Sequence, residues 1–156
     1  MNSKRGFTLM ELMVVIAIIS IMTAIAVPRI GPWLASQKLS SSARDIYSML
    51  QLSRLRAVKE NANVFFSFNS LGYSAFVDNG SGGGIANDNV QNGTEPTIYS
   101  GQFGDSVSFM GASVPSLWFN SRGFASANLG TTITIGNQLG EQRQIILSQL
   151  GRVRIN

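Results

Sequence analysis

The 156-residue sequence contains no cysteine and no histidine. These absences exclude disulfides, thiolate and imidazole metal ligands, cysteine nucleophiles, and general bases or serine triads that use histidine. Charged residues make up only 13% of the chain, against about 25% in ordinary soluble domains, so uncharged polar residues must supply much of the surface. The composition therefore argues against most common enzyme chemistries.

An enzyme without histidine or cysteine would need paired carboxylates. The acidic residues beyond residue 60 are scattered among predicted loops and strand ends: Asp78, Asp88, Glu95, Asp105 and Glu141. We interpret them as ordinary surface charges, and we predict a protein that is not an enzyme, with no catalytic residue, no cofactor and no metal site. The net charge of +4 includes Lys4 and Arg5, so the remaining chain is only mildly basic.

A long apolar run lies near the N-terminus. From Leu12 to Val27 the only polar residues are Ser20 and Thr23. With its flanking residues, such a helix of about 20 residues would span about 30 Å, the thickness of a bilayer core. Lys4 and Arg5 precede the run, so the positive-inside preference places the N-terminus in the cytoplasm and the rest of the chain on the outer side.

Glu11 lies at the head of this run, although a carboxylate costs up to about 3 kcal/mol at mid-bilayer. A secretory signal peptide cleaved near residues 24–26, or a simple uncleaved anchor, would leave this charge unexplained. Cutting the chain after Gly6 would create an α-amino group on Phe7. Opposite charges about 4 Å apart attract by about 4 kcal/mol at an effective dielectric of about 20, so we expect Glu11 to pair with such an amine.

The stretch KRGFTLMEL, residues 4–12, resembles the type III signal of type IV pilins and of the pseudopilins of type II secretion. The resemblance implies that a prepilin peptidase cuts after Gly6 and that Phe7 becomes the N-methylated first residue. It also implies that Glu11 pairs with the N-terminal amine of a neighbouring subunit during assembly. The expected partners are other pilins or pseudopilins, the peptidase and an inner-membrane assembly platform.

The same resemblance implies a location. The chain would cross the bacterial inner membrane once, with its C-terminal domain in the periplasm, before it joins a pilus or pseudopilus. Type IV pili and type II secretion systems use the same processing, so the sequence is compatible with a subunit of either assembly.

We predict a leader over residues 1–6, a transmembrane and assembly helix over 7–30, an amphipathic helical half over 31–60, and a globular domain over 61–156. Pro28, Gly31 and Pro32 predict a kink or a loosened turn, because proline removes a backbone donor. The apolar face of the second half is marked by Leu39, Ala43, Ile46, Leu50 and Ala57. Its basic residues are interpreted as a solvated face, with an acidic-surface contact as the alternative: Lys38, Arg44, Arg54, Arg56 and Lys59.

Short β-type runs follow residue 61, and their spacing predicts eight strands. The expected ranges are 63–69, 72–78, 97–103, 107–111, 116–120, 131–136, 143–148 and 152–155. The predicted fold class is α+β, with a long N-terminal α-helix packed on a C-terminal antiparallel β domain of two sheets. Residues 78–93 are too polar and glycine-rich for a core element and predict a flexible loop, with a calcium site through Asp78 and Asp88 or a subunit contact as alternatives.

The C-terminal stretch, which runs from SLWFNSRGF through TTITIG to RQIILSQLGRVRIN, resembles the GspH/FimT-type domain. Arg152 and Arg154 lie two apart in a predicted strand, so their guanidinium groups should share one face about 6.7 Å apart while Val153 and Ile155 face the core. Two such groups could bind successive phosphates of one DNA strand.

FimT-like minor pilins that take up DNA for transformation carry a C-terminal GRxR motif, and residues 151–154 match it. The resemblance therefore implies DNA binding through Arg152 and Arg154 as the alternative to a purely structural pilin role. Arg122 and Arg143 could extend such a patch. The simpler interpretation is that the arginines discourage edge-to-edge sheet pairing.

Overall fold

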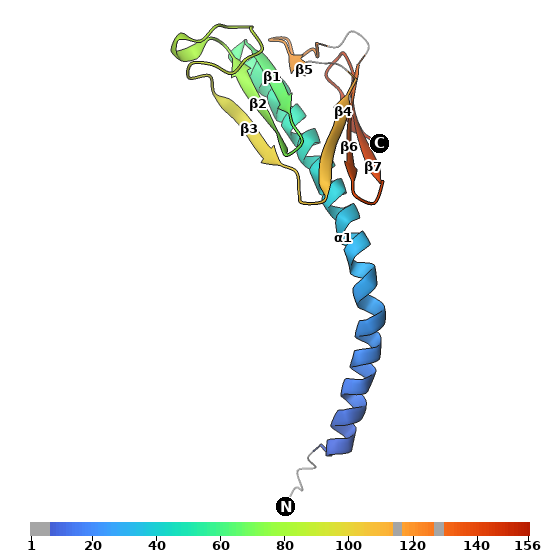
Figure 1. The fold of residues 1–156 in the computed structure, drawn as a ribbon. Helices are drawn as coiled ribbons and strands as arrows, with labels where there is room; N and C mark the ends of the chain where they lie inside the picture. The colour runs from blue at the N-terminus through green and yellow to red at the C-terminus, as the bar shows by residue number, and fades with distance from the viewer. Residues whose placement is uncertain (1–6, 114–116, 127–129) are drawn as a thin grey trace, which may run out of the picture. The chain divides into compact units, whose positions relative to one another are not determined.

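The computed structural model describes residues 7–113, 117–126 and 130–156, without the side chains of Pro28 and Arg29. The chain divides into two compact units, Met1–Leu34 and Ala35–Asn156. One helix, α1 (Leu9–Glu60), contains residues of both units (Figure 1).

α1 continues through Pro28, Gly31 and Pro32, where a kink or a loosened turn is predicted. The carbonyl groups of Ala24 and Pro28 nevertheless lack the usual N–H partner, because the residue four positions on is a proline in each case. The helix stops after Glu60, where Asn61 adopts a left-handed conformation with φ of 49°. The Ala62 N–H then bonds back to the Ala57 carbonyl, which satisfies one of the last free acceptors of the helix.

In the part of the chain that the structure describes, eight strands follow, and each lies within one residue of its predicted range at either end. Their bounds are β1 (Asn63–Phe68), β2 (Gly72–Asp78), β3 (Thr97–Gln102), β4 (Val107–Ala112), β5 (Leu117–Phe119), β6 (Thr131–Asn137), β7 (Gln142–Leu147) and β8 (Val153–Ile155). They form two antiparallel sheets, ordered β3-β2-β1-β5 and β4-β6-β7-β8 (Figure 1). A short 3-10 helix, η1 (Ser81–Gly83), lies between β2 and β3. The predicted two-sheet α+β class is confirmed.

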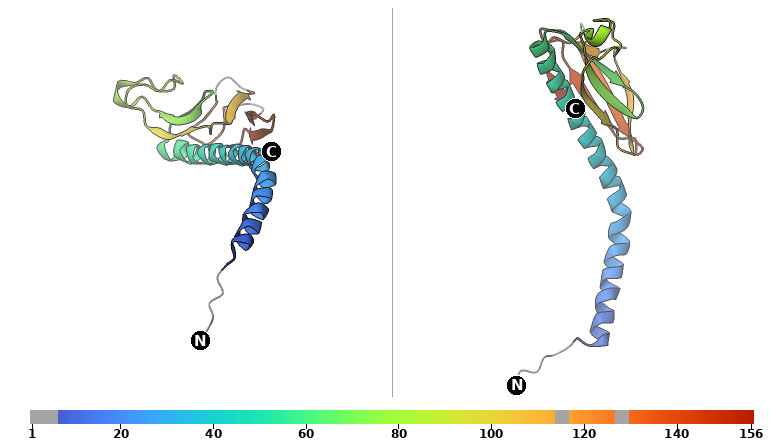
Figure 2. Two further views of the ribbon diagram at one scale, coloured as in Figure 1. Left: turned by 60° about the horizontal axis from the view of Figure 1, so that its bottom comes forward. Right: turned by 90° about the vertical axis from the view of Figure 1, so that its left-hand side faces the viewer.

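The two sheets lie on the same side of residues 35–60 of α1 in both views of Figure 2. One cluster of buried side chains joins the helix to both sheets. The helix contributes Leu39, Ala43, Ile46, Met49, Leu50 and Ala57, and the sheets contribute, among others, Val64, Val77, Phe119, Ile133, Ile145 and Leu147. All five residues predicted for the apolar helix face belong to this core.

The first sheet also carries an aromatic row on the face that points away from the core. Phe65 on β1 is paired with Phe76 on β2 and with Trp118 on β5. The ring centroid of Phe65 lies 6.0 Å from that of Phe76 and 5.7 Å from that of Trp118. This row fixes β5 against β1 although the two strands are far apart in the sequence.

Candidate functional site

The start of α1 contains the residues predicted for processing and assembly. Gly6 lies outside the described residues, and Phe7 is exposed two residues before the helix begins. Thr8 caps the helix, because its Oγ1 accepts the Glu11 N–H at 3.2 Å and its carbonyl accepts the Leu12 N–H at 3.2 Å. Thr8 was not predicted as a functional residue, although the pattern Thr-x-x-Glu is the sequence signature of a capping box.

The capped first turn places the Glu11 carboxylate where negative charge is favoured. Glu11 is the acidic residue of the first turn, and the positive end of the helix dipole lies there. The segment that follows, Leu9–Val27, has a mean hydropathy of 2.5 and none of it is buried, so its length and composition suit a membrane span. Within the described residues, no hydrogen bond or ion pair engages the Glu11 carboxylate.

The C-terminal arginines lie at the edge of the second sheet. Arg154 is paired with Ile146 of β7, and Arg152 directly precedes β8, where its N–H bonds to Ser148 Oγ at 3.1 Å. Both arginines are exposed, and with Ile146, Ser148 and Val153 they line a pocket of about 430 Å³. Their predicted placement on one exposed face is consistent with this register.

The prediction that Val153 and Ile155 both face the core is only half right. Val153 packs against the core, whereas Ile155 is 39% exposed. Ile155 belongs to the last strand of the sheet, and no further strand covers it. An edge strand only three residues long therefore leaves a core-facing side chain partly uncovered.

Arg143 does not extend the arginine pair. It is paired with Ile135 in β6, a core residue, so alternation along β7 places it on the opposite face from Ile146 and Arg154. Arg122 is exposed in the turn that follows β5, and its N–H bonds to Asn120 Oδ1 at 2.9 Å.

Arg54 has a different role from the solvated one predicted for it. Its Nε donates to the Gly123 carbonyl at 3.1 Å, and its Nη1 donates to the Gly151 carbonyl at 3.3 Å. One partly buried guanidinium on α1 therefore holds both the turn after β5 and the turn between β7 and β8. The sequence offers no local signal for this contact, because the partners are distant in the chain.

Both residues bound by Arg54 must be glycine, because of their backbone conformation and the close approach of neighbouring atoms. Gly151 has φ of 76°, and a Cβ there would lie 2.5 Å from the Gly123 carbonyl oxygen. Gly123 has φ of 77°, and its Cβ would lie 3.1 Å from Val58. The glycine of the GRxR string thus allows the turn to approach Arg54 closely, while the arginines that follow it project outward.

The loop between β2 and β3 contradicts the prediction of surface charges for Asp78 and Glu95, whereas Asp105 and Glu141 are exposed as predicted. Asp78 and Glu95 are only 1% and 5% exposed. The Asp78 carboxylate accepts the N–H groups of Asn87 and Asn89, and the Glu95 carboxylate accepts those of Gly80 and Asn92 at 2.9 and 3.0 Å. The loop is therefore fastened by buried carboxylates, and the Asp78 oxygens considered for calcium are occupied by amide hydrogens.

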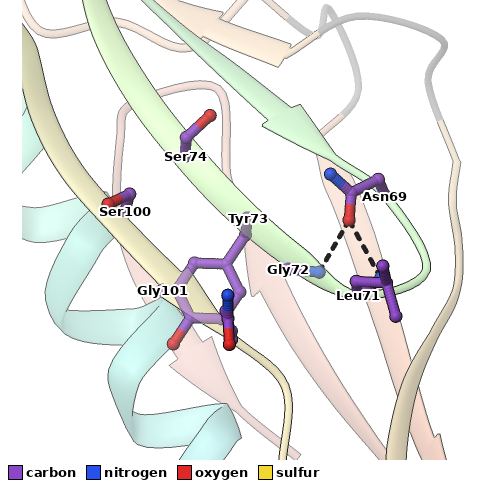
Figure 3. Close-up of a pocket in the computed structure, with 8 residues that line it drawn as sticks. Asn69, Leu71, Gly72, Tyr73, Ser74, Ser100 and Gly101 are labelled. Carbon is purple, nitrogen blue, oxygen red and sulfur yellow. Dashed lines mark hydrogen bonds between the residues drawn. The ribbon is translucent and has the colours of Figure 1, made fainter.

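A second pocket, of about 470 Å³, lies over the β1–β2 turn and β3 (Figure 3). Its shape follows from Asn69, whose Oδ1 accepts the N–H groups of Leu71 and Gly72 at 2.9 and 2.7 Å. Tyr73 is the titratable residue of its lining, and burial, with smaller effects of Asp45 and Tyr99, raises the Tyr73 pKa above its ordinary range. The phenol of Tyr73 therefore stays neutral at ordinary pH.

Two known protein families match this chain, one at its N-terminus and one over its C-terminal domain. Residues 42–151 match the family described as "Type II transport protein GspH", and residues 1–27 match the "Prokaryotic N-terminal methylation motif". The pilin-like protein PilA1 of Thermus thermophilus is 29% identical over 98% of this chain and 99% of its own. A fimbrial protein of Moraxella nonliquefaciens is 50% identical over 42 residues, 27% of each chain.

Two solved structures share the fold. The type IV minor pilin FimU of Pseudomonas aeruginosa superposes with a TM-score of 0.60 at 19% identity, over 80% of this chain and 92% of that one. The minor pseudopilin EpsH from the type 2 secretion system of Vibrio cholerae gives 0.55 at 16% identity, over 76% and 96%. At these identities the likeness concerns the arrangement of helix and sheets.

Proposed function

Because the chain belongs to the GspH family of pilin-like proteins, we propose that it is a minor pilin or pseudopilin, a structural subunit that a prepilin peptidase processes after Gly6. Residues 1–6 are the leader, and residues 7–30 enter first the membrane and then the filament. Residues 31–60 carry the domain formed by residues 61–156, which lies in the periplasm before assembly.

The observation that carries this proposal is the start of α1. Cleavage after Gly6 leaves Phe7 as the first residue, directly before the Thr8 cap and four residues before Glu11. The exposed apolar surface of Leu9–Val27 suits lipid in the free subunit and neighbouring helices in a filament. Glu11 then sets the register between subunits by pairing with the amine of a neighbour.

Intact mass measured on the membrane-extracted protein tests the processing step. A chain that begins at N-methylated Phe7 is expected, and a chain that begins near Val27 would instead show ordinary export. Assembly is tested with Glu11→Leu, which should be processed but excluded from filaments, while Glu11→Asp keeps the charge and should retain part of the incorporation. Equal incorporation of Glu11→Leu and the wild type would contradict the pairing.

We propose DNA binding through Arg152 and Arg154 as the second candidate function. It is supported by the exposure of both side chains on one face of the β8 edge and by the pocket they share with Ser148. Two phosphate contacts would give a slope near −1.8 in log K against log salt on duplex DNA. Retention of duplex DNA should fall in Arg152→Gln/Arg154→Gln and should persist in Arg44→Gln/Arg56→Gln, which removes the same charge from the helix. Equal retention by both double variants would contradict this function.

A further inference from the structure

A third pocket, of about 570 Å³, lies where β5, the turn after it and the β7–β8 turn meet. Its apolar lining comes from Trp118, Phe124 and Leu150, and its polar lining comes from Asn120, Ser126 and Gln149. Phe124 is 40% exposed and Leu150 is 60% exposed, so two large apolar side chains remain open to solvent here. No carboxylate belongs to this lining.

The walls of this pocket are held by hydrogen bonds. The Ala125 N–H donates to the Gln149 carbonyl at 3.0 Å, which fastens the turn after β5 to the β7–β8 turn. The Ser126 N–H donates to the Trp118 carbonyl at 2.9 Å, and the Trp118 N–H donates to Ser126 Oγ at 3.2 Å. Trp118 also packs on Phe65, so its indole ring is supported from the sheet. The pocket is therefore formed before any ligand arrives.

Exposed basic residues lie close in sequence to the lining residues of both turns. Arg122 is exposed between Asn120 and Phe124, and Arg152 is exposed two residues after Leu150. Aromatic and amide side chains in the lining, with exposed arginines in the same turns, suit a flat unsaturated ring that carries a phosphate. A base inside a duplex is stacked and paired, so only an unpaired base could enter such a pocket.

We propose that this pocket binds an unpaired nucleobase of single-stranded DNA while Arg152 and Arg154 hold the adjoining phosphates. The proposal rests on the second candidate function and adds the form of DNA that is bound. Stacking on Trp118 and Phe124 provides the preference for single strands, whereas the arginines act on any phosphate backbone.

Fluorescence anisotropy with the full chain in detergent tests this assignment. The probes are an oligothymidylate, an abasic strand with the same number of phosphates, and a matched duplex. The oligothymidylate should bind about fivefold to a hundredfold more tightly than the abasic strand. Trp118→Leu and Phe124→Leu should remove this preference while leaving duplex binding unchanged, and Trp33→Leu, the same substitution outside the pocket, should keep it.

A second measurement does not depend on the folding of a pocket variant. In the Trp33→Leu chain the remaining indole is Trp118, and the oligothymidylate should quench its emission while the abasic strand should not. Equal binding of all three probes without quenching would overturn the base pocket and leave the phosphate contacts in place. Absence of binding to every probe would overturn the DNA-binding function and the pocket with it.

Discussion

Arg54 and Gly151 are 97 positions apart in the chain, yet the Arg54 Nη1 donates a hydrogen bond of 3.3 Å to the Gly151 carbonyl. The same guanidinium holds Gly123 through its Nε. These bonds connect α1 to the two turns that border the proposed DNA-binding surface, so the placement of the GRxR string depends on a helix residue outside it.

Arg54→Met keeps the aliphatic stem and removes both hydrogen bonds. We expect the free energy of unfolding to fall by about 1–3 kcal/mol, because two backbone carbonyls lose a charged donor in a partly buried place. Urea unfolding of the full chain in detergent measures this. The control is Arg56→Met, whose 3.0 Å pair with Glu60 is exposed and should contribute about 0.3–0.5 kcal/mol at most. Equal losses in the two variants would show that the two Arg54 hydrogen bonds do not stabilise the fold.

Gly151→Ala tests the close approach of the turn. Gly140→Ala is the matched control, because Gly140 has a similar φ of 81° but no atom within 4 Å of its Cβ position. A left-handed alanine should cost about 1–2 kcal/mol at either site. We expect a further loss of about 1 kcal/mol or more at Gly151 from the clash with the Gly123 carbonyl. Thermal unfolding compares the two, and equal losses would mean that the turn shifts freely.

Asp78→Asn should loosen the loop between β2 and β3. An amide has one acceptor oxygen, so one of the two backbone N–H groups that Asp78 binds would lose its partner at a cost of about 1–3 kcal/mol. Hydrogen exchange at Asn87 and Asn89 should accelerate. Asp105→Asn, at an exposed residue, should leave this exchange unchanged, and so should chelation with EDTA. Acceleration by EDTA would instead indicate a bound cation.

The raised pKa of Tyr73 predicts that the folded protein loses stability at alkaline pH. Its pKa is raised in the folded protein above the ordinary value of about 10, chiefly by burial. The unfolded chain therefore loses this proton first, so the contribution of neutral Tyr73 is complete below about pH 10 and declines as the pH rises further. The urea midpoint of the wild type should fall relative to that of Tyr73→Phe above about pH 10. A constant difference would show that Tyr73 ionises normally in the fold.

The strands were predictable because their signals are local. Alternating residues and glycine-rich turns fix the range of each strand, and the spacing of Leu39, Ala43 and Ile46 identifies the buried helix face. Contacts between distant segments carry no such signal. Arg54 looks like any solvated helix arginine until the turns containing Gly123 and Gly151 are placed beside it.

The acidic residues show the same limit. Asp78 and Glu95 resemble surface charges in sequence, and their burial follows from amide groups that the loop itself presents. Ile155 follows the alternation of its strand but lies at a sheet edge, which is a property of the strand order rather than of its neighbours. Thr8 is the exception, since its cap could have been recognised from its spacing to Glu11 alone.

The two hydrogen bonds that Arg54 makes to the Gly123 and Gly151 carbonyls also have a mechanical consequence. A load drawn along residues 35–60 of α1 would pass to the sheets through the apolar core, and Arg54 would carry it to both turns as well. Because both turns bond to one guanidinium, a shift of the helix against the sheets would move the two turns together.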